Sequence, residues 1–408
     1  MERVAITGLG LVTSIGIGRA DFWSALTAGR SGISRVESFD PSAYSAELGG
    51  EVRGFDPDPY IRRQSGEQMG RASRLAIAAA RLALDDARLV LSPEDAAEHG
   101  VVMGTTSGEP RLIEQYNDTR QAEDSSALTP EFFPQYPCQV IPARIARELE
   151  LRGPSLTIPT ACAAGAVAIG YGCDLLRSGR TKMMLCGGAD AFSRITYMGF
   201  ARLGAIAPER CRPFDRNREG MIPGEGAAVL VLERLSDAQA RGAKIYAETL
   251  GYGVRGDAHH MTAGHPEGRG AVAAMRAALR GSGVEPDEVD YVSAHGTGTR
   301  SNDRMESVAL HELLGERAAR VPISSIKSML GHTMGAASAI EAAACCLALD
   351  TGVIAPTINF EEPDPECPVD CVPNQARQAG PKIVLNNAYA FGGVNASLCL
   401  RRYEEPSA

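Results

Sequence analysis

The sequence predicts an α/β protein built from two similar halves. Short apolar runs end in glycine or a polar residue, and each is followed by a longer segment whose apolar residues recur at helical spacing. This alternation of strand and helix favours sheets covered by helices on their faces. The same rhythm starts again near residue 247, which indicates an internal duplication.

The first half, residues 1–246, contains the strands and helices expected of such a fold. Apolar runs predict strands at residues 3–12, 100–104, 182–189 and 227–232, and a further short strand just before Cys162. Helical spacing predicts helices at residues 20–28, 68–89, 142–150 and 163–176. Residues 110–142 lack sustained periodicity, which predicts a long irregular excursion.

The second half, residues 247–408, repeats the pattern. Strands are predicted at residues 289–293, 323–326, 382–390 and 396–401, and helices at residues 270–281, 303–314 and 336–349. Two strands that end in glycine turns, one starting at Val4 and one at Val289, are expected to occupy equivalent places in the two halves.

Composition excludes several classes of protein. A chain of 408 residues with 44% hydrophobic content can bury a large core, and no tract is biased enough to be disordered. The net charge of -9 argues against a nucleic-acid-binding protein. No run of about 18 uninterrupted apolar residues predicts a membrane span, and the N-terminus enters a strand at once, without room for a signal peptide. We therefore expect a cytoplasmic globular protein.

Cys162 differs from the other nine cysteines in its setting. It lies between a short strand and an Ala-rich helix, with small neighbours on both sides. A thiol at a helix N-terminus is stabilised as the thiolate, so this position predicts a lowered pKa and a reactive nucleophile. The alternative is a buried structural cysteine, the commoner role of this residue type. The local sequence leaves both interpretations open.

Two histidines have similar surroundings. His295 and His332 each follow a predicted strand in a segment rich in Gly, Ser, Thr and Ala, where loops present reactive groups in α/β folds. Each alone fits a structural histidine, but with Cys162 they form three polar groups at strand ends, as expected of a site that a substrate approaches closely. Of the adjacent His259 and His260, which lack this setting, His260 is expected to come nearer a substrate. Zinc binding by Cys162 and the two histidines fails on ligand count and spacing.

Four motifs in chain order then identify a family. They are Thr160-Ala161-Cys162-Ala163-Ala164-Gly165, His295-Gly296-Thr297-Gly298-Thr299, Lys327 followed by Gly331-His332, and Phe391-Gly392-Gly393-Val394-Asn395. This set resembles that of the β-ketoacyl-acyl carrier protein synthases, above all the synthase II type and the ketosynthase α subunits of type II polyketide systems. The resemblance covers nearly the whole chain and includes Arg212-Pro213-Phe214-Asp215 and Gly224-Glu225-Gly226.

The resemblance implies a thiolase-like fold, in which two α/β halves make an αβαβα arrangement of layers. It also implies a homodimer or a heterodimer with a related chain, and acyl carrier protein as a partner. The implied activity is an acyltransferase that condenses an enzyme-bound acyl thioester with malonyl-acyl carrier protein, with loss of carbon dioxide. No metal or dissociable cofactor is needed, since the substrates are carried on phosphopantetheine.

The resemblance also assigns roles to residues. Cys162 would take the acyl chain as a thioester, and His295 and His332 would hold the malonyl carbonyl and promote decarboxylation. Backbone N–H groups of Cys162 and Phe391 would form the oxyanion hole. Lys327 and Glu306 would form a supporting ion pair, and Thr297 and Thr299 would contact the phosphopantetheine arm. Phe391 would act as a gate between the half-reactions, and Gly392, which follows it, would contact the substrate.

Three positions depart from the family pattern. The last motif usually begins with Gly, and Ala390 is expected to restrict the backbone motion of the gate. Ser338 stands where Gly is common. Ser107 occupies a position at the bottom of the acyl pocket that tends to be a bulky aliphatic in synthase II. These changes favour a specialised or polyketide-type substrate without identifying it.

Two other functions are compatible with the fold. A chain-length factor, the non-catalytic partner of polyketide ketosynthases, keeps the fold but usually lacks the active cysteine, whereas Cys162, His295, His332 and Lys327 are all present here. A biosynthetic thiolase would need a second cysteine elsewhere. The condensing enzyme is therefore the preferred interpretation.

Docking of an acidic carrier protein requires local positive charge on this acidic chain. The densest basic group of the first third, joined by one later arginine in a predicted loop, is the candidate surface: Arg62, Arg63, Arg71, Arg74 and Arg202. The alternative for each arginine is an ordinary solvated position.

Overall fold

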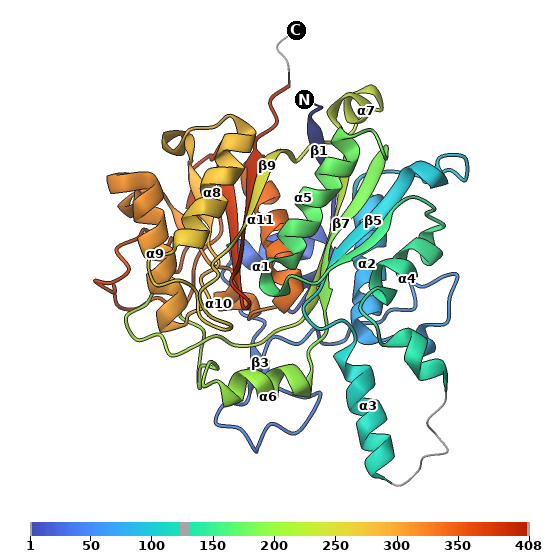
Figure 1. Ribbon diagram of the computed structural model, residues 1–408, viewed down its shortest axis with the longest axis horizontal. Coiled ribbons are helices and arrows are strands. Elements are labelled where there is room, and N and C mark those ends of the chain that lie inside the picture. The colour runs from blue at the N-terminus through green and yellow to red at the C-terminus, as the bar shows by residue number, and fades with distance from the viewer. Residues whose placement is uncertain (1, 123–129, 406–408) are drawn as a thin grey trace.

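The protein is arranged in five layers (Figure 1). The computed structural model describes residues 2–122 and 130–405. Helices α5 (Ala164–Arg177) and α11 (Ala337–Thr351) form the central layer, and a part of the sheet lies on each side of it. Helices α2 (Arg71–Asp86) and α4 (Val140–Leu149) cover one outer face, and α8 (Arg269–Ser282) packs on the other. The predicted αβαβα arrangement is confirmed.

The first half contributes five consecutive strands of the sheet. Two antiparallel pairings are followed by two parallel pairings. In spatial order the strands are β1 (Val4–Thr13), β8 (Gly226–Arg234), β7 (Met183–Asp190), β5 (His99–Gly104) and β6 (Ser155–Ile158).

The second half repeats this order of pairings. Its strands are, in the same sense, β9 (Ala247–Gly256), β15 (Val394–Arg401), β14 (Ile383–Ala390), β10 (Tyr291–Ser293) and β11 (Ile323–Ser324). The halves join where β1 pairs antiparallel with β9 over three residues of each. The equivalent of β1 is therefore β9, and the prediction that the strands starting at Val4 and Val289 are equivalent is wrong. The comparison failed because β10 corresponds to β5: each is the fourth strand, in spatial order, of its half of the sheet.

The remaining elements are short or peripheral. The other helices are α1 (Arg19–Thr27), α3 (Pro110–Gln121), α6 (Arg194–Arg202), α7 (Leu235–Ala240), α9 (Arg300–Leu314) and α10 (Lys327–Leu330). The other strands are β2 (Gly16–Ile17), β3 (Ser34–Arg35), β4 (Leu48–Gly49), β12 (Val353–Ile354) and β13 (Arg377–Gln378).

Helix α3 corrects one prediction. Residues 110–142 were expected to be irregular, yet Pro110–Gln121 is helical, with proline in its first turn. Pro110 is the buried residue of this helix, so no apolar stripe marks its period in the sequence. Residues 123–129 of the same segment lie outside the described part of the chain.

Helix α11 lies in the centre of the molecule. The segment Met334–Thr351 is long and apolar enough to cross a membrane, but 89% of it is buried inside the protein, as expected of a core helix. Its first turn approaches α5 so closely that a Cβ atom on Gly165 would lie 2.7 Å from the backbone nitrogen of Ala339. The absence of a side chain at Gly165 therefore lets the start of α5 meet the start of α11.

The carboxyl ends of the parallel strands in both halves point toward this meeting place. Cys162 follows β6, and His295 follows β10, while Lys327 and His332 follow β11. The β14–β15 turn adds Phe391. Groups from both halves thus converge beside the central helices.

Candidate active site

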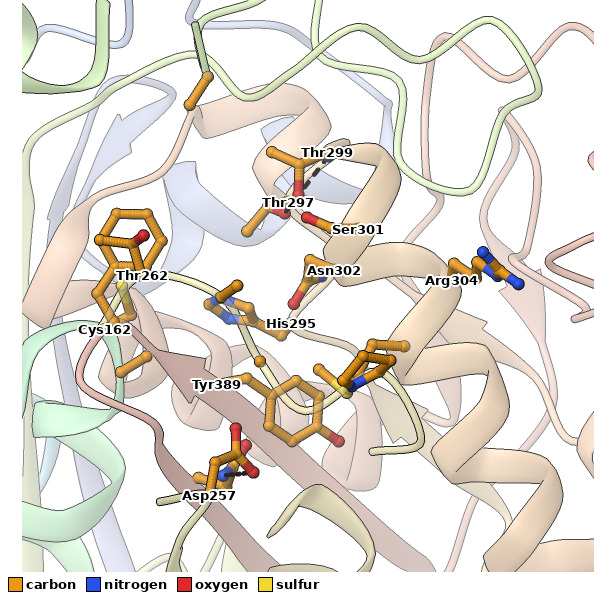
Figure 2. Close-up of a pocket in the computed structure, with 18 of the residues that line it drawn as sticks. Cys162, Asp257, Thr262, His295, Thr297, Thr299, Ser301, Asn302, Arg304 and Tyr389 are labelled. Carbon is orange, nitrogen blue, oxygen red and sulfur yellow. Dashed lines mark hydrogen bonds between the residues drawn. The ribbon is translucent and has the colours of Figure 1, made fainter. Parts of the chain in front are cut away.

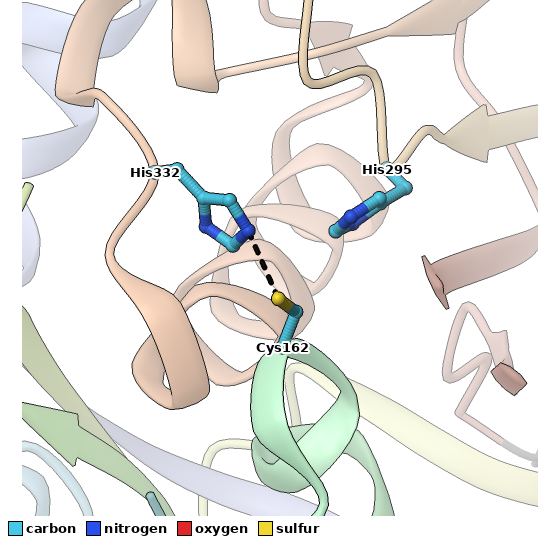
Figure 3. Close-up of side chains that lie close together, drawn as sticks. All are labelled: Cys162, His295 and His332. Atoms are coloured by element: carbon cyan, nitrogen blue, oxygen red, sulfur yellow. Dashed lines mark hydrogen bonds between the residues drawn. The ribbon is translucent and has the colours of Figure 1, made fainter. Parts of the chain in front are cut away.

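Cys162, His295 and His332 form one buried cluster (Figure 3). The Cys162 sulfur and one ring nitrogen of each histidine lie within 4.8 Å of one another. The Nε2 atom of His332 is 3.1 Å from the Cys162 Sγ, and the two imidazole rings meet edge to face with centroids 5.4 Å apart. The structure therefore brings together the three groups that the sequence singled out. Their chemical roles remain predictions.

A strained turn presents Cys162. The chain leaves β6, forms a short 3₁₀ turn at Ala161–Ala163, and enters α5 at Ala164. Ala161 has a φ of 48°, in the left-handed region that a non-glycine residue rarely adopts. Such conformations persist only where the surroundings fix them, and they gather at functional sites.

The Cys162 thiol does not have the lowered pKa that its helix position predicted. Burial raises its pKa to about 12, because the thiolate loses solvent, and the nearby positive charge of Lys327 offsets only part of this. The reactivity of Cys162 therefore depends on access. It is the one cysteine among the residues that line the adjoining pocket.

Hydrogen bonding fixes the tautomer of His332. Its Nδ1 atom accepts a hydrogen bond from the backbone N–H of Met334 at 3.2 Å, so in the neutral ring the proton is on Nε2. That N–H points at the Cys162 sulfur. Burial, with the charge of Lys327, lowers the pKa of His332 well below its usual value, which keeps the ring neutral.

His295 is also held as a neutral ring. Burial lowers its pKa well below its usual value, and the charge of Lys327 acts in the same direction. Its backbone N–H donates to Glu306 Oε1 at 2.9 Å, and the next N–H, of Gly296, donates to Oε2 at 2.8 Å. Burial raises the pKa of this carboxyl to about 8. Glu306 therefore fixes the loop that carries His295.

The predicted ion pair between Lys327 and Glu306 is wrong. The Lys327 ammonium pairs with Glu341, and both side chains are about 2% exposed. Glu306 is instead occupied by the two backbone N–H groups of the His295 loop. Sequence reasoning missed Glu341, although a single acid in the Ala-rich run at residues 337–349 is a usable signal because unpaired charges are rarely buried.

Asp190 is a second acidic residue that the sequence analysis missed. Its buried carboxylate accepts hydrogen bonds from the Thr105 hydroxyl and from the backbone N–H groups of Thr106, Ser107 and Gly335, at 2.7–3.0 Å. Burial raises its pKa to about 6. Asp190 thus ties the loop after β5 to the segment after His332. Ser107, predicted at the bottom of an acyl pocket, is half-buried here and is not among the residues lining the pocket beside Cys162.

A pocket of about 570 Å³ opens beside the cluster (Figure 2). Its lining includes Cys162, both histidines, Thr297 and Thr299, and the two threonine hydroxyls are 2.9 Å apart. The lining is largely apolar, and the paired threonine hydroxyls add a polar contact that suits an amide-containing arm ending at the sulfur. The nearby histidine that lines the pocket is His259, not His260 as predicted, because His260 Nδ1 accepts hydrogen bonds from the backbone N–H groups of Thr262 and Ala263.

Phe391 lies at this pocket and is 41% exposed. Its ring meets that of Phe200 from α6, with centroids 5.7 Å apart. The turn that carries it takes its left-handed conformations at Gly392 and Gly393, with φ of 86° and 74°, and Gly392 N–H donates to the carbonyl of Met261 at 2.8 Å. Ala390 is not among the positive-φ residues, so the turn itself depends on the two glycines.

The five predicted docking arginines have different surroundings. Arg71 is tied to buried Glu225 and to the carbonyl of Val52, and Arg74 donates to the carbonyl of Met69. Arg202 ends helix α6 and is not in a loop. None of the five lines the pocket.

Arg62 and Arg63 are exposed next to α4. Their backbone N–H groups donate to Glu148, the penultimate residue of α4, and the Arg63 guanidinium pairs with Glu150, which follows the helix, at 2.7 Å. Together with Arg202, these two arginines are the exposed members of the predicted docking set. Arg71 is excluded because its guanidinium is committed to a buried carboxylate.

The donor set of the cluster also bears on metals. A thiol and two imidazoles within 4.8 Å of one another are close enough to bind one metal ion. The expectation that the site works without a metal therefore remains a prediction.

Comparison with known proteins identifies relatives along the whole chain. Residues 1–238 match the family described as beta-ketoacyl synthase, N-terminal domain, and residues 246–361 match the C-terminal domain of the same family. The chain is 40% identical over 410 residues to 3-oxoacyl-[acyl-carrier-protein] synthase 2 of Synechocystis sp., covering 99% of each protein. It is also 40% identical over 418 residues to the tetracenomycin polyketide synthase ketoacyl synthase alpha subunit of Streptomyces glaucescens, covering 99% of this chain and 98% of that one.

A similar solved structure is described as the ishigamide ketosynthase/chain length factor. The two chains superpose with a TM-score of 0.94 at 45% identity, covering 99% of this chain and 100% of the other. The likeness therefore extends through both halves of the fold.

Proposed function

The chain belongs to the beta-ketoacyl synthase family, and we propose that it extends an acyl chain held on Cys162 by two carbons drawn from malonyl-acyl carrier protein. It is an acyltransferase that forms a carbon–carbon bond. The product is a β-ketoacyl-acyl carrier protein, in fatty-acid or type II polyketide synthesis. The observation that carries the assignment of roles is the thiol held 3.1 Å from a neutral imidazole with a second neutral imidazole beside it.

The first half-reaction moves the acyl chain to Cys162. The sulfur attacks the thioester carbonyl of the acyl carrier protein, the old carbon–sulfur bond breaks, and the thiol proton passes to the departing pantetheine sulfur. The His332 Nε2–H group, aimed at the sulfur, stabilises the thiolate during attack. Backbone N–H groups of Cys162 and Phe391 stabilise the tetrahedral oxyanion.

The second half-reaction uses the histidines. Once the sulfur is acylated, its affinity for the His332 N–H falls, and that N–H turns to the carbonyl oxygen of the malonyl thioester together with His295. Loss of carbon dioxide leaves an enolate whose negative oxygen the two N–H donors stabilise. Its carbon attacks the Cys162 thioester, the sulfur leaves as thiolate, and the thiolate takes up a proton from solvent. Neutral rings are suited to this role because each offers a donor without holding the malonyl carboxylate as an ion pair.

Thr297 and Thr299 serve the arm of the carrier protein. Their paired hydroxyls line the pocket between solvent and the sulfur, where they can donate to the pantetheine amides (Figure 2). No metal takes part in this proposal, since the polarising groups are hydrogen-bond donors of the chain itself.

The alternative function, a non-catalytic chain-length factor, is disfavoured by the same site. A subunit that only shapes a pocket has no chemical use for a thiol clustered with two neutral imidazoles, or for a buried ammonium whose charge acts on all three. A thiolase is disfavoured because Cys162 is the one cysteine in the pocket lining.

We further propose a dimer formed through strand β6. Within the described part of the chain this strand ends the sheet, with β5 as its one neighbour, and Leu156 on it is 38% exposed. An unpaired edge with exposed apolar residues is a ready site for strand pairing. The partner is a second copy or a related ketosynthase-like chain, such as the chain length factor named for the structural relative. We place this soluble assembly in the cytoplasm.

The direct test of the function is intact-mass analysis after incubation with acyl-carrier proteins of different chain lengths. The protein should gain the mass of the acyl group, the label should map to Cys162, and the extent should identify the preferred chain length. A wild-type protein that gains no acyl mass from any carrier, or carries it on another residue, would contradict the proposal.

A further inference from the structure

Ser338, at the start of α11, lies between the two parts of the site. Its hydroxyl donates to the backbone carbonyl of Cys162 at 3.1 Å and accepts from the backbone N–H of Ala166 at 2.9 Å. The side chain has no exposure to solvent. The carbonyl of Ser338 in turn accepts from the Asn386 side chain at 2.8 Å, so the residue is held from both sides.

The contact with Ala166 supplies a helix cap that α5 otherwise lacks. The residue before the helix is Ala163, which has no side chain able to accept a hydrogen bond, and none caps the helix locally. The N–H of Ala166 is one of the amide groups that a helix leaves unpaired at its start. A serine from a different helix therefore does what a serine or aspartate at the N-cap usually does.

The contact with Cys162 joins segments from the two halves of the chain. Ala161, just before the nucleophile, and Met334, just after His332, both have left-handed backbones, with φ of 48° and 54°. Non-glycine residues keep such conformations only where neighbouring contacts fix them. Ser338 lies four residues after Met334, and its hydroxyl donates to the carbonyl of Cys162, the residue that follows the strained Ala161.

We propose that Ser338 is a positioning residue for the condensation: its hydroxyl ties the Cys162 turn to the segment that follows His332, and so keeps the sulfur opposite the His332 Nε2 atom. The inference rests on the proposed function of Cys162. It explains why a hydroxyl is useful at a position where this family commonly has glycine. The hydroxyl touches no reacting atom, so its effect passes through the backbone of Cys162.

The test is Ser338→Ala, which removes the hydroxyl and leaves the backbone of α11 unchanged. We expect kcat of condensation to fall about ten-fold, the size of one lost buried hydrogen bond, with KM for the carrier-bound substrates unchanged. The rate of Cys162 alkylation by iodoacetamide should fall in parallel, and its dependence on pH should shift to higher pH, because the thiolate loses part of its contact with the His332 N–H. Ser338→Gly removes the same hydroxyl and should show the same losses.

Ser397→Ala is the matched control. Ser397 lies on strand β15, and its hydroxyl is equally buried and donates to Asn387 Oδ1 at 2.7 Å. This variant should lose comparable thermal stability while keeping wild-type kcat and alkylation rate. The inference is overturned if kcat and alkylation in both Ser338 variants stay within two-fold of wild type, or if Ser397→Ala shows the same losses. Cys162→Ala in the condensation assay separates the role of Ser338 from the proposed function of Cys162. If this variant still forms condensed product, the proposed function itself fails.

Discussion

The turn that carries Cys162 and the turns that carry the histidines are built differently. Cys162 is surrounded by Ala and Gly, and its turn brings no charged side chain of its own to the site. His295 and His332 lie beside buried ionisable side chains: Glu306 accepts the backbone N–H groups of one loop, and the Lys327–Glu341 pair lies beside the other. The nucleophile is thus placed by backbone geometry, and the histidines by contacts with buried ionisable side chains.

Because of this difference, a residue of the second half influences the protonation of Cys162 as well as that of the two histidines. The Lys327 charge lowers the pKa of both histidines and also lowers that of Cys162 against the larger effect of burial. Burial is the main cause of the lowered histidine pKa values; the Lys327 charge adds to that effect and also favours the thiolate. Changes in the second half should disturb the whole site, whereas changes at Cys162 should leave the histidines working.

The largest expected effect is that of Lys327→Met. It leaves Glu341 buried without its partner, so the free energy of unfolding should fall by about 3–5 kcal/mol, and condensation should be lost. Urea unfolding and the condensation assay measure the two effects. The double variant Lys327→Met with Glu341→Leu is the control: stability should return while activity stays absent. Recovery of activity in the double variant would show that the ammonium has no role in the chemistry.

His295→Ala and His332→Ala should each slow malonyl decarboxylation about 100-fold or more, since each removes one donor to the developing enolate. Acylation of Cys162 should suffer less, and least in His295→Ala, because His332 is the ring in contact with the sulfur. Release of carbon dioxide and the acyl mass on the protein give the two rates separately. Equal losses in both half-reactions for both variants would mean that the histidines serve cysteine activation or folding.

Glu109 tests a buried carboxyl outside the cluster. It accepts the N–H groups of Ala72 and Ser73 at the start of α2, and burial raises its pKa from 4.5 to about 7. A raised pKa favours the folded state at low pH, and this contribution is lost as pH rises from about 4.5 through 7. In wild type the stability advantage over Glu109→Gln should therefore shrink by about 1–3 kcal/mol between pH 4.5 and pH 8.5.

The measurement for Glu109 is the free energy of unfolding at several pH values. Glu312→Gln is its control, because Glu312 is an exposed carboxyl paired with Arg276 and should show no such trend. A difference between wild type and Glu109→Gln that is constant or grows with pH would contradict the raised pKa.

The smallest effect concerns docking. Arg62→Glu with Arg63→Glu should raise KM for acyl carrier protein several-fold at low salt, and the effect should fade above about 0.1 M salt, where charges more than about 10 Å apart are screened. Turnover of a small acyl-pantetheine should stay near wild type. The control, Arg180→Glu with Lys182→Glu, reverses two adjacent charges that follow the end of α5 far along the helix from Cys162. An unchanged KM for the carrier protein would remove Arg62 and Arg63 from the docking surface.

Much of the fold and the identity of the reactive groups could be predicted from the sequence. Strand ends marked by glycine and polar residues placed Cys162, His295 and His332 correctly, because parallel strands bring their carboxyl ends together. The partner of Lys327 could not be read in this way: the choice between Glu306 and Glu341 depends on which acid is already occupied by backbone N–H groups. Helix α3 was missed because Pro110 is its one fully buried residue and the others are half-buried or exposed. The raised pKa of Cys162 was missed because burial is a property of the packed structure.

The central claim, that the nucleophile and the decarboxylating pair are separable, is tested most directly by Cys162→Ala. The variant removes the sulfur but leaves His295, His332, Lys327 and their anchors in place. It should accept no acyl group and make no condensed product, yet still release carbon dioxide from malonyl-acyl carrier protein at a measurable rate. Condensed product from Cys162→Ala, or complete loss of decarboxylation in a variant shown to be folded, would contradict the account.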